Sequence, residues 1–89
     1  MIIDVYDTYS KARNGRIIHF DVLLPSGGTK ETALKFAREF LKEIGEPLEL
    51  LKQERCNFCH SQDASEEIKD FIEKNGHFIL QMDGCPEPH

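Results

Sequence analysis

The dipeptide Asn14-Gly15 constrains the fold of this chain more than any other short feature. It lies between two runs rich in β-branched and aromatic residues, IIDVYDTY and RIIHFDVLL. Asn-Gly favours a tight hairpin turn, because both central residues of that turn need a positive φ angle. The sequence therefore predicts two paired strands, at about residues 2–9 and 16–24.

A two-residue turn would set the hairpin register so that Tyr9 faces Phe20 and Tyr6 faces Leu23. One face would then be the core side, despite Asp7 and Lys11, and would carry Ile3, Val5, Tyr9, Ile18, Phe20, Val22 and Leu24. The other face would be polar and turned outward, and would carry Asp4, Tyr6, Thr8, Ser10, His19 and Asp21.

The polar face holds candidates for a small surface site, namely Tyr6, Thr8, His19 and Asp21. An exposed sheet face is ordinarily polar without being a site, and the sequence favours that interpretation. In the two-residue register Asp7 projects to the apolar side, away from Asp4 and Asp21. These three aspartates are therefore expected to be solvated carboxylates rather than a divalent-ion cluster.

Two helices and two further strands follow the hairpin. Thr29 is a plausible N-cap for a helix over about 30–44, where apolar residues recur at spacings of three and four. LELLKQERC predicts a strand over about 48–55, DASEEIKDFIEKNG a second helix that ends at Gly76, and HFILQM a last strand.

The resulting order, β-β-α-β-α-β, predicts an α+β two-layer sandwich: a four-stranded mixed sheet with both helices on one face. We expect a single domain over residues 1–85 and a loosely ordered tail over 86–89.

Composition excludes several classes of function. The formal net charge of −5 argues against nucleic acid and against an anionic membrane surface as partners. The first ten residues, MIIDVYDTYS, lack the basic start and apolar run of a signal peptide, so a cytoplasmic location is expected. In such a reducing compartment, thiols are more often metal ligands, catalytic groups or core residues than disulfide partners.

The segment CNFCH carries two of the three cysteines, Cys56 and Cys59. If the strand at 48–55 and the last strand were parallel neighbours, their carboxyl ends would share one sheet edge, and Cys85 would join the other two cysteines there. Three thiolates would suit zinc, with His60 as the nearest fourth ligand and His89 or Asp83 as others. Reduced cysteines packed at the sheet edge explain the pattern equally well.

Two other interpretations of CNFCH remain open. A C-x-x-C ahead of a helix is typical of redox dithiols, although the second helix here starts several residues after Cys59. The C-x-x-C-H pattern of covalent haem attachment is disfavoured, because that chemistry needs an export signal and a mainly helical wrapping.

Several separated segments together resemble one known family: VYDTY, HFDV, CNFCHSQ and NGHFILQMDGC. The chain from Ile2 to Cys85 is similar to small, mostly bacterial single-domain proteins classified as a domain of unknown function. The resemblance implies a compact α+β fold and no established activity. The family pattern includes Tyr6, Asp7, Thr8, Tyr9, His19, Asp21, Cys56, Cys59, His60, Ser61, Gly84 and Cys85.

The sequence thus favours a small cytoplasmic domain that binds zinc at a cysteine-rich corner and has a binding or regulatory role, with no catalytic residue assigned. The alternatives are a thiol redox protein that uses the C-x-x-C, and a metal-free interaction module, which would include assembly as a homo-oligomer.

Overall fold

The computed structural model of the protein describes residues 1–83. The elements follow the order β1 (Ile2–Lys11), β2 (Ile17–Pro25), α1 (Lys30–Glu43), a single 3-10 turn η1 (Gln53–Arg55), β3 (Cys56–Asp63), α2 (Glu66–Asn75) and β4 (Phe78–Gln81). The predicted α+β class and the order of strands and helices are confirmed. Neither helix in residues 1–83 is long and apolar enough to cross a membrane.

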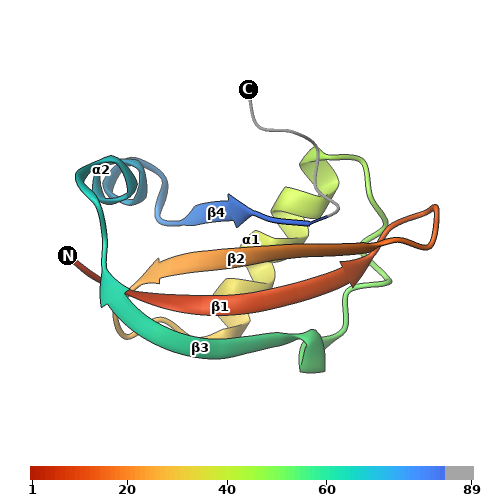
Figure 1. The fold of residues 1–89 in the computed structure, drawn as a ribbon, viewed down its shortest axis with the longest axis horizontal. Helices are drawn as coiled ribbons and strands as arrows, with labels where there is room; N and C mark the ends of the chain where they lie inside the picture. Colours follow the sequence, from red (N-terminus) through yellow and green to blue (C-terminus); the bar gives the residue numbers. More distant parts are fainter. Residues whose placement is uncertain (84–89) are drawn as a thin grey trace.

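The four strands form one sheet in the order β3-β1-β2-β4, and each neighbouring pair is antiparallel (Figure 1). The predicted mixed sheet is therefore wrong. Strands β3 and β4 occupy opposite edges, with β1 and β2 between them.

The hairpin connection has three loop residues rather than two. The amide of Gly15 donates to the carbonyl of Ala12 at 3.0 Å, the amide of Ala12 donates to the carbonyl of Arg16 at 2.8 Å, and Gly15 has a φ of 86°. This is the pattern of a turn followed by a left-handed glycine, the commonest three-residue hairpin loop. Tyr9 consequently faces His19 instead of Phe20, and the register predicted from a two-residue turn is wrong by one residue.

A one-residue shift exchanges the two faces of one strand relative to the other. In the observed register, Tyr6, Thr8 and Ser10 share a face with the apolar residues of β2 that contact α1. This core includes Ile18, Phe20, Val22, Leu24, Ala37, Phe40 and Leu41. Asp7 and Tyr9 instead share the opposite face with His19 and Asp21.

The helices pack on opposite faces of the sheet. Helix α1 covers the face just described, behind the sheet in Figure 1. Ile72 and Ile68 of α2 pack against Ile3, Val5 and Leu23, whose side chains belong to the other face. The predicted placement of both helices on one face is therefore wrong, and α2 covers only one end of its face.

Both helices begin where the sequence supplies a side-chain cap. The hydroxyl of Thr29 accepts from the amide of Thr32 at 3.2 Å, and Ser65 caps α2 by accepting from the amide of Ile68 at 3.3 Å. A capping hydroxyl satisfies one of the otherwise unpaired amides of the first turn. Gly76, with a φ of 84°, ends α2.

The third strand begins later than predicted. Residues 48–52 are irregular, η1 follows, and β3 starts only at Cys56. The polar run CNFCHSQD forms a strand because it pairs with the free edge of β1, a tertiary effect that overrides local propensity. The pairing shifts at one point: Val5 faces His60 and Tyr6 faces Phe58, so that Cys59 is the extra residue of a β-bulge.

Candidate functional site

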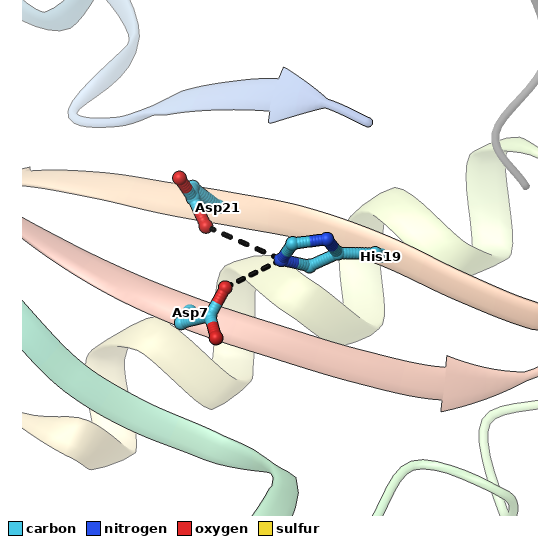
Figure 2. Close-up of side chains that lie close together, drawn as sticks. All are labelled: Asp7, His19 and Asp21. Carbon is cyan, nitrogen blue, oxygen red and sulfur yellow. Dashed lines mark hydrogen bonds and ion pairs between the residues drawn. The ribbon is translucent and has the colours of Figure 1, made fainter. Parts of the chain in front are cut away.

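Three ionisable side chains meet on the sheet face that α1 does not cover. Asp7 comes from β1, and His19 and Asp21 come from β2 (Figure 2). The register places Asp7 directly opposite Asp21, while His19 lies two residues away on the same face. The Nε2 atom of His19 lies 2.5 Å from Oδ1 of Asp7 and 3.9 Å from Oδ1 of Asp21.

The surrounding strands hold the imidazole in place. The ring of Tyr9 stacks on that of His19, with centroids 4.2 Å apart and planes inclined by 10°. The backbone of His19 also continues the ladder beyond β4: its amide donates to the carbonyl of Asp83 at 2.8 Å, and its carbonyl accepts from Met82 at 3.0 Å. The position of His19 is thus fixed by both its backbone and its ring.

The two carboxyl groups have different environments. Asp21 is 8% exposed, and burial together with the nearby Asp7 carboxylate raises the pKa of Asp21 to about 6. Partial burial acts to raise the pKa of Asp7 too, but hydrogen bonds with His19 and Asp21 outweigh it, so the pKa of Asp7 is lowered overall. Two neighbouring carboxyls whose pKa values are pushed apart can divide the roles of proton donor and anion.

The cluster also presents a set of metal ligands. One oxygen from each carboxylate and one imidazole nitrogen all lie within 4.8 Å of one another. Among the described residues, Oδ1 of Asp21 is buried and has no hydrogen-bond partner, so one acceptor in the cluster is left unsatisfied. A mixed set of one nitrogen and two carboxylate oxygens suits zinc and other divalent first-row ions better than it suits calcium or magnesium.

Comparison with protein families gives one match that covers nearly the whole described chain. Residues 1–82 match the family model described as "Domain of unknown function (DUF2024)". The protein belongs to the DUF2024 family. The resemblance inferred from its separated motifs is confirmed at the level of the family.

This DUF2024 domain is also similar to a solved structure. The NMR structure of protein NE1680 from Nitrosomonas europaea, a target of the Northeast Structural Genomics Consortium, is 40% identical in sequence. The alignment covers 97% of this chain and 100% of that one, with a TM-score of 0.81. A comparison with curated proteins finds no significant match.

The two cysteines of the DUF2024 chain's C-x-x-C have different surroundings. Cys56 is fully buried beside the α1 core, and its Sγ accepts a hydrogen bond from the Thr8 hydroxyl at 3.5 Å. Burial raises the pKa of the Cys56 thiol. Cys59 is exposed at the bulge. A zinc site or a dithiol couple needs both sulfurs at one point, and this strand gives them separate environments.

The strand pairing expected to bring Cys85 to the other two cysteines is absent from the described sheet. It required the strand before Cys56 and the last strand to be parallel neighbours, whereas β3 and β4 lie at opposite edges of an antiparallel sheet. Helix α2 begins beyond the far end of β3, so its N-terminus is not beside Cys56. Cys85 itself, His89 and the predicted tail at 86–89 lie outside the described residues.

The other predicted ligands of the cysteine corner have their own contacts. His60 is exposed, with Nδ1 3.3 Å from Sγ of Cys59 and Nε2 2.7 Å from Oε1 of Gln62. The carbonyl of Asp83 accepts a hydrogen bond from the amide of His19 in β2. Strands β1 and β2 therefore lie between Asp83 and β3. The structure therefore pairs His60 with Cys59 and separates Asp83 from both.

The predicted polar surface site is divided between the two sheet faces. Tyr6 and Thr8 are buried on the α1 side, where the Tyr6 hydroxyl donates to the carbonyl of Gly28 at 3.1 Å and Thr8 donates to Cys56. His19 and Asp21 are on the opposite face. Half of that set therefore supports the core, and the other half belongs to the ionisable cluster.

Sequence reasoning missed Asp7 as a site residue, together with the stacking of Tyr9. A two-residue turn puts Asp7 on the apolar face. The signal that identifies it is the alternation of the two strands: a register with three loop residues brings Asp7, His19 and Asp21 together and leaves Tyr6 with the core. Asp4, also expected to be solvated, is 7% exposed and accepts from Ser61 and the amide of Gly27.

Proposed function

We propose that this DUF2024 domain binds a divalent first-row metal ion, with zinc the first choice, through Asp7, His19 and Asp21. The observation that carries the proposal is the convergence of three ligand atoms within 4.8 Å on a face that α1 leaves open. The buried Oδ1 of Asp21 has no hydrogen-bond partner among residues 1–83 and only the distant His19 imidazole as a charged neighbour, which supports the proposal because a cation would satisfy that acceptor.

Metal entry requires a small rearrangement of the side chains. Ligand atoms around a tetrahedral zinc lie about 3.3 Å apart, given bonds of about 2.0 Å. The contact between His19 and Asp7 at 2.5 Å must open, and Asp21, now 3.9 Å from the imidazole, must approach. The three residues leave further coordination positions for water or a ligand, the arrangement typical of zinc sites that do chemistry or bind small molecules.

We thus propose the same metal as the sequence suggested, zinc, but with a different set of ligands. A location in a reducing cytoplasm is part of the proposal, supported by the free thiols of Cys56 and Cys59. Because β3 and β4 each leave one strand edge unpaired within the described sheet, association with a partner or a second copy stays a prediction.

A thiol function is the second candidate, and Cys59 alone supports it. Its sulfur is exposed and lies 3.3 Å from the imidazole of His60, a contact in which the ring can accept the thiol proton. This candidate would use one cysteine and not the C-x-x-C as a couple, because Cys56 is buried in the core.

The test is zinc and cobalt titration of untagged, chelator-treated protein. We expect one equivalent of zinc, with at least tenfold weaker binding in Asp7→Asn, His19→Gln and Asp21→Asn variants. Affinity should rise as the pH is raised through about 6, because Asp21 must lose its proton to bind the ion.

The matched controls are Cys56→Ser, Cys59→Ser and His60→Gln. These variants should retain zinc affinity. Cobalt bound to the unsubstituted protein should show no sulfur-to-cobalt charge-transfer band. If the cysteine variants lose the metal and the aspartate variants keep it, the proposed ligand set is wrong and the cysteine corner is the site.

A further inference from the structure

A hollow of about 690 Å³ lies next to the ionisable cluster, at the end of the sheet near the hairpin loop. Pairing between β1 and β3 stops at Thr8 and Cys56, so the last residues of β1 have no strand on their outer side. The irregular segment before β3 and the turn η1 lie alongside instead. The hollow is lined by Tyr9, Ser10, Lys11, Ile17, Leu50, Lys52 and Arg55.

The charge of this hollow is opposite to that of the chain. The protein has a net charge of −5, yet the three ionisable groups other than Tyr9 that line the hollow are all basic: Lys11, Lys52 and Arg55. Within residues 1–83, none of these three forms an ion pair with a carboxylate. Cations gathered around one concave surface without a counter-charge attract an anion, and an arginine adds paired donors that fit phosphate oxygens.

A buried serine borders the hollow from the other face of the sheet. Ser10 lines the same hollow and is 4% exposed, and its Oγ has no hydrogen-bond partner among the described residues. Leaving a buried hydroxyl unpaired is unfavourable. The side chain of Ser10, however, shares the α1 face with Ile18, whereas Tyr9, Lys11 and Ile17 project to the opposite face, so the hydroxyl is not part of the anion site.

Tyr9 connects the hollow to the candidate metal site. Its side chain lines the hollow and stacks on His19 at a centroid distance of 4.2 Å. The apolar side chains of Ile17 and Leu50 complete the lining and offer contact to an organic group. A volume of about 690 Å³ is also within the range of small-molecule sites in proteins.

We propose that the hollow binds the phosphate group of a small phosphorylated molecule, held by Lys11, Lys52 and Arg55, whose organic part extends past Tyr9 to the Asp7, His19 and Asp21 site. A phosphate monoester is favoured over a carboxylate because its dianion matches three positive charges. A polyanion such as nucleic acid is disfavoured by the acidic remainder of the chain. The contact with the metal site rests on the proposed function, whereas phosphate binding itself does not.

The experiment is an NMR titration of ¹⁵N-labelled, metal-free protein with inorganic phosphate and with phenyl phosphate, at constant ionic strength. Amide shifts should concentrate at Ser10, Lys11, Lys52 and Arg55. Phenyl phosphate should bind at least threefold more tightly than inorganic phosphate. Equal affinity for both would overturn the assignment to an organic ester, and shifts located elsewhere would overturn the site.

A pair of charge-matched variants separates the hollow from general charge. Lys52→Gln with Arg55→Gln should weaken phosphate binding at least tenfold. Lys69→Gln with Lys74→Gln removes the same charge from α2 and should leave the affinity within twofold. Equal losses in both double variants would contradict the proposal.

Zinc titration of the same samples distinguishes the two proposals. If phosphate binds at the hollow and no zinc binds, the metal site fails and the anion site stands. If zinc binds and phosphate causes no shifts at the hollow, the anion site fails alone. With both bound, phenyl phosphate should also shift the amides of His19 and Asp21.

Discussion

The two faces of the sheet use polar residues in different ways. On the α1 face, Tyr6 and Thr8 are buried, and their hydroxyls donate to a carbonyl and to a sulfur. On the opposite face, Asp7, His19 and Asp21 lie together, and one buried carboxylate oxygen has no hydrogen-bond partner among the described residues. The first arrangement satisfies its polar groups within the fold. The second leaves bonding capacity for a ligand.

The difference follows from how each helix covers its face. The apolar stripe of α1 runs the length of its face and excludes water from it. Helix α2 packs only on the end near Ile3 and Leu23, so within residues 1–83 no helix covers the end near His19. A polar cluster on the open end is stable because solvent or a ligand can reach it, whereas the same cluster under α1 would carry the full cost of burial.

The largest expected effect comes from breaking the covered face. Phe20 is fully buried and packs on Phe40 with ring centroids 4.8 Å apart. Phe20→Ala should lower the free energy of unfolding by about 3–5 kcal/mol through lost burial and the cavity left behind. Leu80→Ala, on the open face at 40% exposure, should cost less than about 1 kcal/mol in the same denaturant titrations. Similar losses for the two variants would contradict the asymmetry between the faces.

An intermediate effect of opposite sign is expected from Asp21→Asn. The pKa of Asp21 is about 6 in the folded protein and 3.8 as the ordinary value. Between these values the folded state binds more protons than the unfolded state, so stability falls as pH rises, and the penalty persists above pH 6. The amide removes this penalty and should stabilise the protein by about 1–2 kcal/mol at neutral pH.

The gain from Asp21→Asn should disappear below about pH 4, where the carboxyl is protonated in both states. Denaturation series across pH measure it, and the control is Asp70→Asn on the exposed side of α2. A gain in stability that does not depend on pH would mean that burial and Asp7 do not raise the pKa of Asp21.

The features that the sequence predicted correctly have local signals. Thr29 and Gly76 mark helix ends by their own chemistry, and the apolar spacing of each helix repeats within a few residues. The features it did not predict depend on contacts between distant segments. CNFCHSQD becomes a strand only because β1 has a free edge, and no local pattern indicates which strands are neighbours.

The candidate site was only partly predictable, because part of it depends on how the two strands of the hairpin are aligned. His19 and Asp21 were found because they alternate with apolar residues of one strand. Asp7 was missed because its relation to them depends on the hairpin loop, and Asn14-Gly15 is compatible with loops of two or three residues. The cysteine corner was a stronger sequence pattern than the cluster, but it depended on a parallel crossover that the sheet does not contain.

The smallest effect tests the loop that brings the cluster together. Gly15 has a φ of 86°, and a Cβ added there meets no atom within 4 Å, so a side chain costs only backbone strain. Gly15→Ala should therefore lower stability by about 1 kcal/mol, and Gly15→Asn by less, because Asn tolerates the left-handed region better. Zinc affinity should be unchanged in both, since the register is also held by the remaining pairs of β1 and β2. If Gly15→Ala is neutral, the left-handed three-residue loop is not the connection that sets the register, and the placement of Asp7 beside Asp21 must be attributed to strand packing alone.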